Sequence, residues 1–265
     1  MRGIEKSFPG VRALDGVDLE VRAGEVHALV GENGAGKSTL MKILAGALPA
    51  DGGSIEIDGA PVRIAGPRSA ESFGIGMIYQ EFNLVPDLGV VENVVLGHEP
   101  LRRGLLDARA ARARTIAVLE ELGIALPLDR PARRLAVAEQ QLLEIAKTFA
   151  RKARLIVMDE PTAALSERET ERLFGLISQL RARGVAFVYI SHRLEELPRI
   201  ADRITVIRDG KTVATAPAGE LDAREVVRLM VGRALDAHFP ALPEVAPAAP
   251  LVLAVRELSS GERVR

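Results

Sequence analysis

A glycine-rich run between a strand pattern and a helix pattern constrains this chain more than any other feature. Residues 31–38 read Gly-Glu-Asn-Gly-Ala-Gly-Lys-Ser, which fits the pattern of a phosphate-binding loop. An expected buried strand at 25–30 precedes the run, and apolar residues at helical spacing follow Lys37. Backbone N–H groups of such a loop point at phosphate oxygens. Lys37 would face the β and γ phosphates, and the Ser38 hydroxyl would bind Mg²⁺. The alternative is an ordinary glycine-rich turn.

Short apolar strands alternate with helical patterns, which predicts an α/β fold with a largely parallel sheet. The expected strands are residues 17–21, 25–30, 54–58, 75–79, 155–158, 185–190 and 204–207. Residues 89–149 carry helical patterns only, so we expect an all-helical insertion into the α/β domain. Asp107 is expected to cap one of its helices, with Ile116, Leu119 and Leu122 facing inward.

Two adjacent carboxylates, Asp159 and Glu160, follow the expected strand 155–158. Ligands of open α/β sheets collect at the carboxyl ends of the strands. Asp159 could therefore reach Mg²⁺ directly or through water, and Glu160 could polarise an attacking water. Acidic residues also favour the N-terminus of a following helix. The phosphate-binding loop in the same chain favours the functional interpretation.

Composition excludes several classes of function. The chain has 35 basic and 36 acidic residues among 265, so its net charge of −1 argues against a protein built mainly to grip nucleic acid. It has no cysteine, which excludes a disulfide framework, a thiolate nucleophile and a cysteine zinc site. Aromatic residues are 3% of the chain, so the arginines at 102, 103, 109, 112 and 114 are interpreted as a solvated helix face. His27 is expected to be a core residue.

The C-terminal part differs in composition. Residues 236–250 hold four prolines and five alanines, which predicts a stiff, extended linker. Residues 251–255 resemble a new strand, so we interpret 251–265 as the truncated start of a second domain.

Further motifs, in order along the chain, resemble those of the ATP-binding cassette (ABC) ATPases across nearly its full length. Gln80 stands where that family has its Q-loop glutamine, and His192 where it has its switch histidine. Phe8 matches the aromatic residue that stacks on adenine. Residues 163–166 match the D-loop, and residues 135–141 stand where the family has its signature.

The resemblance implies an ABC nucleotide-binding domain over residues 1–235, with a P-loop NTPase core, an N-terminal β subdomain and an inserted helical subdomain at about 89–149. It implies ATP contacts at Phe8, Gly31, Glu32, Asn33, Gly34, Ala35, Gly36, Lys37, Ser38 and Thr39. It implies Mg²⁺ contacts at Ser38, Gln80 and Asp159. The catalytic residues that it implies are Glu160, His192 and Gln80.

The signature departs from the family pattern. Its positions are Leu135, Ala136, Val137, Ala138 and Glu139. Ala136 replaces a serine and so lacks its hydroxyl, and two glycines and a glutamine are also replaced. Ser166 replaces the D-loop aspartate, and it is expected to form a capping box with Glu169 for the next helix.

Residues 79–86, 91–97 and 140–147 resemble the ribose- and galactose-type sugar-import ATPases, which carry two cassettes in one chain. This resemblance implies a subunit of a bacterial monosaccharide importer, at the cytoplasmic face of the inner membrane, that couples MgATP-driven dimer closure to a permease. The partners implied are transmembrane permease subunits, a second cassette and, indirectly, a periplasmic sugar-binding protein, with no nucleic acid. The permease surface would lie near residues 80–96.

Two other interpretations stay open at this point. One is a soluble tandem ABC protein that acts on the ribosome, although the linker is Pro/Ala-rich and short rather than long and charged. The other is a nucleotide-binding module with little turnover, because Ala136 weakens the signature.

Overall fold

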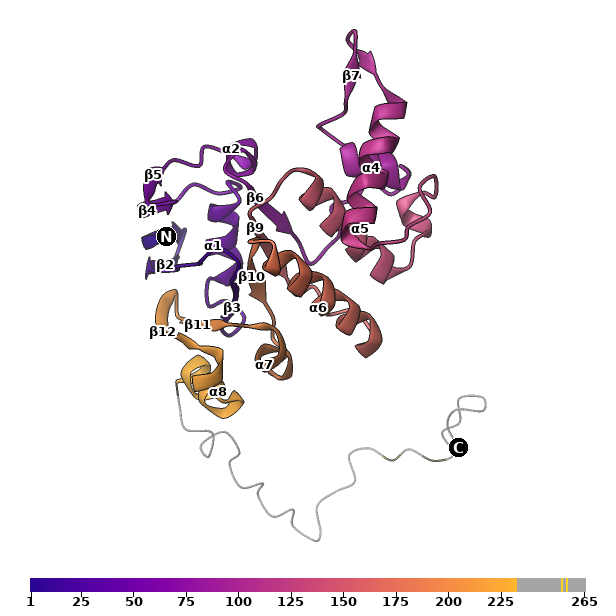
Figure 1. Ribbon diagram of the computed structural model, residues 1–265. Coiled ribbons are helices and arrows are strands. Elements are labelled where there is room, and N and C mark those ends of the chain that lie inside the picture. Colours follow the sequence, from indigo (N-terminus) through magenta and orange to yellow (C-terminus); the bar gives the residue numbers. More distant parts are fainter. Residues whose placement is uncertain (233–253, 255, 257–265) are drawn as a thin grey trace. The chain divides into compact units, whose positions relative to one another are not determined.

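The computed structural model describes residues 1–232, together with the isolated residues 254 and 256. Residues 1–232 form one compact unit (Figure 1). The expected linker at 236–250 and the expected second domain at 251–265 fall outside the described residues, apart from those two positions, and stay predictions.

A six-stranded sheet forms the centre of this unit. Its order is β12(Lys211–Pro217)-β11(Arg203–Arg208)-β3(Val26–Val30)-β10(Ala186–Ile190)-β9(Leu155–Asp159)-β6(Ile75–Ile78). The strands are parallel except for β12, which pairs antiparallel with β11. This confirms the largely parallel α/β fold. The carboxyl ends of β3 and β9 flank that of β10, so the residues after these three strands meet at one edge.

Helices cover both faces of this sheet (Figure 1). Successive side chains of β10 point to opposite faces of the sheet, and each face packs against a helix. Phe187 and Tyr189 pack with α6 (Glu167–Ala182), whereas Val188 and Ile190 pack with α1 (Lys37–Leu44). The other helices outside the insertion are α2 (Pro67–Ser72), α7 (Leu197–Ile200) and α8 (Ala223–Val231). The 3₁₀ turns are η1 (Ala132–Arg134), η2 (Leu194–Glu196) and η3 (Ala218–Glu220).

A second, antiparallel sheet forms the N-terminal β subdomain. Its order is β2(Val11–Val17)-β1(Arg2–Phe8)-β4(Gly52–Ile57)-β5(Ala60–Val62). The strand expected at 17–21 was wrong. The chain leaves the sheet after Val17, and Leu19 stays buried through a pair of hydrogen bonds with Met1. Its burial continues the apolar alternation beyond the true end of the strand.

The insertion contains α3 (Val90–Val95), α4 (Ala108–Leu122) and α5 (Val137–Ala150). The expectation of helices alone was wrong, because the strands β7 (Leu101–Arg102) and β8 (Leu105–Leu106) form a small hairpin. Positive φ angles at Arg103 (53°) and Gly104 (84°) make its tight turn.

Contacts within the insertion confirm one cap and correct two expectations. The Asp107 carboxylate accepts a hydrogen bond from the Ala110 N–H at 3.0 Å, as expected of the cap of α4. Ile116 was expected to face inward but is 37% exposed, because the polar Thr115 takes the buried place and donates to the carbonyl of Ala111. Arg114 does not belong to a purely solvated face, since its guanidinium donates to the Ala150 carbonyl at 2.6 Å and joins α4 to α5.

Two further expectations concern single residues in the core and at a helix start. His27 is fully buried, as expected, with ring nitrogens 2.9 Å from a Glu25 oxygen and 2.7 Å from the Thr205 hydroxyl. At the start of α6, the Glu169 carboxylate accepts from the Ser166 N–H at 2.8 Å, which is the returning half of the capping box. Among the described residues, none of the helices has the length and apolar character needed to cross a bilayer.

Candidate functional site

A pocket of about 240 Å³ opens where the loop after β3 faces the end of β9. It brings together most of the residues that the sequence suggested for phosphates, metal and water. Its lining residues are Ala13, Asn33, Gly34, Gly36, Lys37, Ser38, Thr39, Gln80, Asp159 and Glu160. The loop and the acidic pair, more than a hundred residues apart in sequence, therefore share one site.

Close packing of backbone fixes the shape of the loop at two glycines. A Cβ at Gly31 would lie 2.2 Å from the carbonyl oxygen of Ile207 in β11. Gly36 has a φ of +105°, and a Cβ there would lie 2.6 Å from the carbonyl oxygen of Ala13. Only glycine fits both positions without displacing backbone. The loop consequently holds its N–H groups at the N-terminus of α1, which is the arrangement that receives phosphate.

Lys37 spans the loop from the first turn of α1. Its ammonium donates to the carbonyl oxygens of Gly31 at 2.7 Å and Glu32 at 2.9 Å. Burial lowers the pKa of Lys37, while the carboxylates of Asp159 and Glu160 oppose that shift. The ammonium thus lies in the same electrostatic field as the acidic pair.

Asp159 ends β9, the strand that brings it to the pocket. Burial raises the pKa of Asp159, the charge of Glu160 raises it further, and Lys37 and Lys42 oppose the rise. Two carboxylates held this close favour a cation between them and the loop. Ser38, Gln80 and Asp159 contribute hydroxyl, amide and carboxylate oxygens to one pocket, and these hard oxygen donors fit Mg²⁺.

Glu160 lies between Gln80 and His192. The Gln80 side-chain amide donates to one Glu160 oxygen at 3.3 Å, and His192 Nδ1 lies 3.1 Å from the other. Glu160 has a φ of +49°, a left-handed conformation that residues other than glycine rarely adopt. Its N–H donates to the carbonyl of Ile190, the last residue of β10, at 2.9 Å. The backbone therefore aims this carboxylate into the pocket beside two polar side chains.

The other suggested residues lie outside that pocket in the described part of the chain. Phe8, at the end of β1, is 41% exposed, and the Lys6 ammonium lies 5.8 Å from the centre of its ring. Glu32 belongs to the loop but does not line the pocket, and the same holds for Gly31 and Ala35. An adenine-stacking role for Phe8 stays a prediction.

The signature residues stand at the start of α5, apart from the Lys37 pocket in the described chain. Ala136 precedes the helix and has no side-chain oxygen to cap it. The Glu139 carboxylate instead accepts the Ala136 N–H at 2.8 Å. Val137 is 42% exposed, and Leu135 is buried in the core of the insertion.

Two residues that line or support the site carry no signal in the sequence. Ala13 of β2 lines the pocket because the antiparallel sheet packs against the loop. Gly210, in the β11–β12 turn, donates its N–H to the carbonyl of Ala35 at 3.1 Å and accepts from the Asp15 N–H at 2.8 Å. Both positions depend on tertiary packing between segments far apart in the chain.

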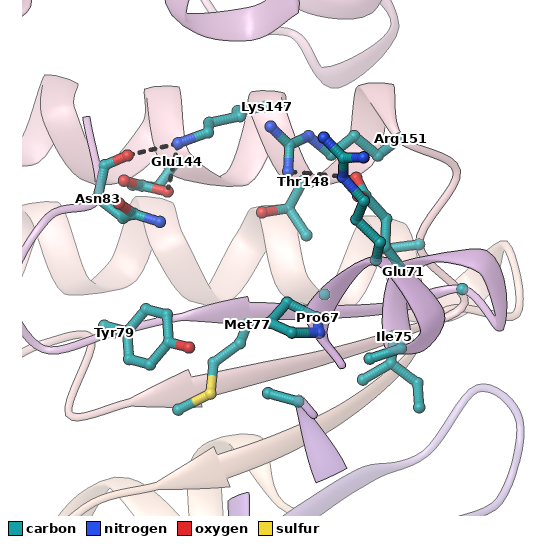
Figure 2. Close-up of a pocket in the computed structure, with 16 residues that line it drawn as sticks. Pro67, Glu71, Ile75, Met77, Tyr79, Asn83, Glu144, Lys147, Thr148 and Arg151 are labelled. Atoms are coloured by element: carbon teal, nitrogen blue, oxygen red, sulfur yellow. Dashed lines mark hydrogen bonds and ion pairs between the residues drawn. The ribbon is translucent and has the colours of Figure 1, made fainter. Parts of the chain in front are cut away.

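Figure 2 shows a second pocket, beside the segment that carries Gln80. Lys147 of α5 donates to the backbone carbonyl of Asn83 at 2.5 Å and lies 3.9 Å from Glu144 (Figure 2). Burial raises the pKa of Glu144 and lowers that of Lys147, and each charge opposes the shift of the other. The helix that starts at the signature thus holds the loop of Gln80 through one buried ammonium.

Comparison with known proteins identifies the family. The family model described as "ABC transporter" matches residues 14–163, more than half of the chain. The chain belongs to the ABC transporter family. This ABC cassette is 51% identical to a ribose import ATP-binding protein of Rubrobacter xylanophilus over 265 residues, all of this chain and 53% of that protein. It is 48% identical to a putative ribose/galactose/methyl galactoside import ATP-binding protein of Burkholderia cenocepacia, again over all of this chain and 52% of that protein. It spans about half the length of these curated relatives.

Solved structures agree with this family. The ADP conformation of an ATP-binding cassette of an ABC transporter is 27% identical, with a TM-score of 0.76 over 88% of this chain and 97% of that one. A dimeric cassette in a post-hydrolysis state, bound to ADP and Pi, is 26% identical, with a TM-score of 0.69 over 82% of this chain and 97% of that one. These likenesses show that the chain has the fold of an ATP-binding cassette.

Proposed function

We propose that this ABC cassette binds MgATP in the Lys37 pocket and hydrolyses it with Glu160 as the group that polarises water. The observation that carries the proposal is the placement of Glu160, which contacts Gln80 and His192 at the rim of a pocket that also holds Lys37 and Asp159. The loop N–H groups and Lys37 would bind the phosphates. Ser38, Gln80 and Asp159 would hold Mg²⁺, which neutralises phosphate charge during transfer.

Substitution of Glu160 tests the chemical part of the proposal. Glu160→Gln keeps the shape of the side chain but removes its charge. We expect MgATP binding to persist and phosphate release to slow by about 10²–10⁴-fold, the scale of acid–base assistance. Glu167→Gln, an exposed change at the start of α6, is the matched control. Turnover at the wild-type rate in Glu160→Gln would refute the assignment.

Substitution of Lys37 tests the binding part. Lys37→Ala removes one charge-assisted phosphate contact, so affinity for a fluorescent ATP analogue should fall by about 10–150-fold, or roughly 1.5–3 kcal/mol. Lys152→Ala, an exposed change beyond the end of α5, should leave affinity nearly unchanged. Equal affinities for the two variants would remove Lys37 from the site.

We further propose that the cassette serves a bacterial sugar importer as a peripheral subunit on the inner face of the cell membrane. The names of its relatives support this, since they are described as ribose or ribose/galactose import proteins. The dimeric cassette structure supports a second cassette as partner, with the Ala136 end of α5 facing the other cassette's phosphates. Permease subunits would contact the region of residues 80–96, which joins the Gln80 loop to α3.

Reconstitution tests the transport proposal separately from hydrolysis. The protein would be placed in liposomes with the permease of a ribose importer and its binding protein. Ribose should stimulate phosphate release, and an unrelated amino acid should not. Basal hydrolysis without any response to ribose or galactose would contradict sugar import and leave the ATPase assignment intact.

A further inference from the structure

One buried carboxylate outside the pocket joins the two loops that carry Glu160 and His192. Glu196, the last residue of η2, is 3% exposed. Its Oε2 atom accepts hydrogen bonds from three hydroxyl groups, those of Thr162 at 3.0 Å, Tyr189 at 2.7 Å and Ser191 at 3.1 Å. Its Oε1 atom lies 3.4 Å from the guanidinium of Arg193.

Two of the three hydroxyl donors lie in the loops that carry Glu160 and His192. Thr162 lies two residues after Glu160, in the loop that follows β9. Ser191 directly precedes His192, in the loop that follows β10. Glu160 and His192 contact each other at 3.1 Å on the pocket side. Glu196 therefore fixes, from the buried side, both loops whose side chains meet in the site.

The conformation of Glu160 needs such a hold. Its left-handed backbone, with φ at +49°, persists only where the surroundings fix it. The N–H bond of Glu160 to Ile190 supplies one restraint, and the bond from Thr162 to Glu196 supplies another two residues later. Loss of the second restraint would let the loop relax and turn the Glu160 carboxylate away from His192.

A carboxylate suits this cluster better than its amide. A buried charge is costly unless hydrogen bonds compensate it, and the hydroxyl donors do so here. Burial raises the pKa of Tyr189, so its hydroxyl keeps its proton and stays a donor. The ring is itself fixed, since the Phe174 ring of α6 meets it edge-on at a centroid distance of 6.2 Å. A glutamine would present an NH₂ group to hydroxyls that are already oriented to donate.

We propose that Glu196 is a positioning residue for ATP hydrolysis. It keeps the side chains of Glu160 and His192 in contact with each other and does not itself touch the nucleotide. The proposal rests on the roles given above to Glu160 and His192. It adds a buried residue, behind the site, to the pair whose contact it supports.

Glu196→Gln tests the proposal, with Glu195→Gln as its control. Glu195 is the exposed neighbour in the same turn, so the control changes charge by the same amount without touching the cluster. For Glu196→Gln, we expect kcat for phosphate release to fall by about 10–100-fold, the scale of a misplacement of about 1 Å. The KM for MgATP should stay within about twofold of wild type, because the phosphate loop is not involved. A folded variant with wild-type kcat would overturn the proposal.

A second pair of variants covers the case in which Glu196→Gln fails to fold. Thr162→Val removes the hydroxyl that reaches Glu196, and Thr162→Ser keeps it. Positioning through Glu196 predicts a lower kcat for the valine variant and a near-normal one for the serine variant, measured well below the melting temperature of both. A purely structural role predicts a lower melting temperature for the valine variant with equal kcat for the two, which would refute the proposal.

The Glu160→Gln variant separates the two levels of inference. If it hydrolyses ATP normally, the proposed function fails at its own residue. If it is slow while Glu196→Gln and Thr162→Val are both normal, the site stands and only the positioning role of Glu196 is refuted.

Discussion

His192 Nδ1 lies 3.1 Å from a Glu160 oxygen, although the His192 side chain is 63% exposed and the Glu160 side chain only 22%. The contact joins the end of β10 to the end of β9 across the rim of the pocket. An exposed histidine held by a half-buried carboxylate is available to a phosphate as well as to its partner.

Removal of this histidine should reduce turnover more than binding. For His192→Ala, we expect kcat to fall by about 10–10³-fold, the cost of losing a hydrogen-bond donor to developing charge. The KM for MgATP should change by less than about threefold, because the loop N–H groups remain. His98→Ala is the control, since His98 is also exposed and lies 2.9 Å from a glutamate, Glu71, outside the site. Equal kcat values for both variants would contradict a role for His192.

The raised pKa of Asp159 leads to a prediction about stability. Without Mg²⁺, the folded protein binds a proton at Asp159 more tightly than the unfolded chain does, because burial and then the charge of Glu160 raise this pKa above 3.8. The free energy of unfolding should therefore fall as pH rises through the folded-state pKa. Asp159→Asn lacks this contribution, so its stability should depend less on pH as the pH rises above 3.8.

Urea unfolding of both proteins at several pH values, with a chelator present, measures this difference. Asp159→Asn should also hydrolyse MgATP far more slowly than the wild type. A pH dependence as steep in the variant as in the wild type would show that Asp159 is not the titrating group.

Ala136 leads to a prediction about the signature. In a homodimer of this cassette, each α5 N-terminus would face the partner's phosphates without a serine hydroxyl. We expect Ala136→Ser to raise phosphate release at saturating ATP by about tenfold or more, because one hydrogen bond to a charged group contributes about 1.5–3 kcal/mol. Ala113→Ser, an exposed change on α4, is the control. Brisk wild-type turnover with no gain from the added serine would show that backbone N–H groups alone suffice, and it would also exclude the low-turnover interpretation.

The buried pair Lys147 and Glu144 leads to a prediction about the Gln80 loop. Lys147→Met leaves Glu144 buried without its cation and frees the Asn83 carbonyl, so the free energy of unfolding should fall by about 3 kcal/mol. The double variant Lys147→Met with Glu144→Leu should recover part of that loss, because no unpaired charge remains. Thermal unfolding of the single and double variants measures this. A double variant that is less stable than the Lys147→Met variant would refute the claim that the unpaired charge of Glu144 causes the loss of stability.

The phosphate-binding loop and the acidic pair of the site were predictable because a short stretch of sequence carries the pattern of each. The loop at 31–38 is predicted by the local order of an apolar strand, a glycine-rich run and a helix. Asp159 and Glu160 follow a short apolar run of the kind that is typical of a central strand. The β subdomain was less predictable. In β1 and β2, Gly3 and Gly16 interrupt the alternation, and the register shifts between these strands leave no clean period of two.

Residues that act through tertiary contacts left no sequence signal. Ala13 reaches the pocket because a separate sheet packs over the loop, and no pattern around an alanine reports that. Glu196 resembles its neighbour Glu195 in sequence, yet one is buried under three hydroxyls and the other is exposed. The β7–β8 hairpin was missed because strands of two residues are too short to show a period.

At Glu160, the residue that suits catalysis is not the residue that suits the left-handed backbone, so activity and thermal stability favour different side chains at this position. Glycine, and to a lesser degree asparagine, would adopt this conformation with less strain than glutamate does. Selection of variants for thermal survival alone should therefore draw position 160 toward those two residues. Selection that also requires ATP turnover should retain the carboxylate. The residue found at position 160 after selection therefore shows whether variants were selected for thermal survival alone or for activity as well.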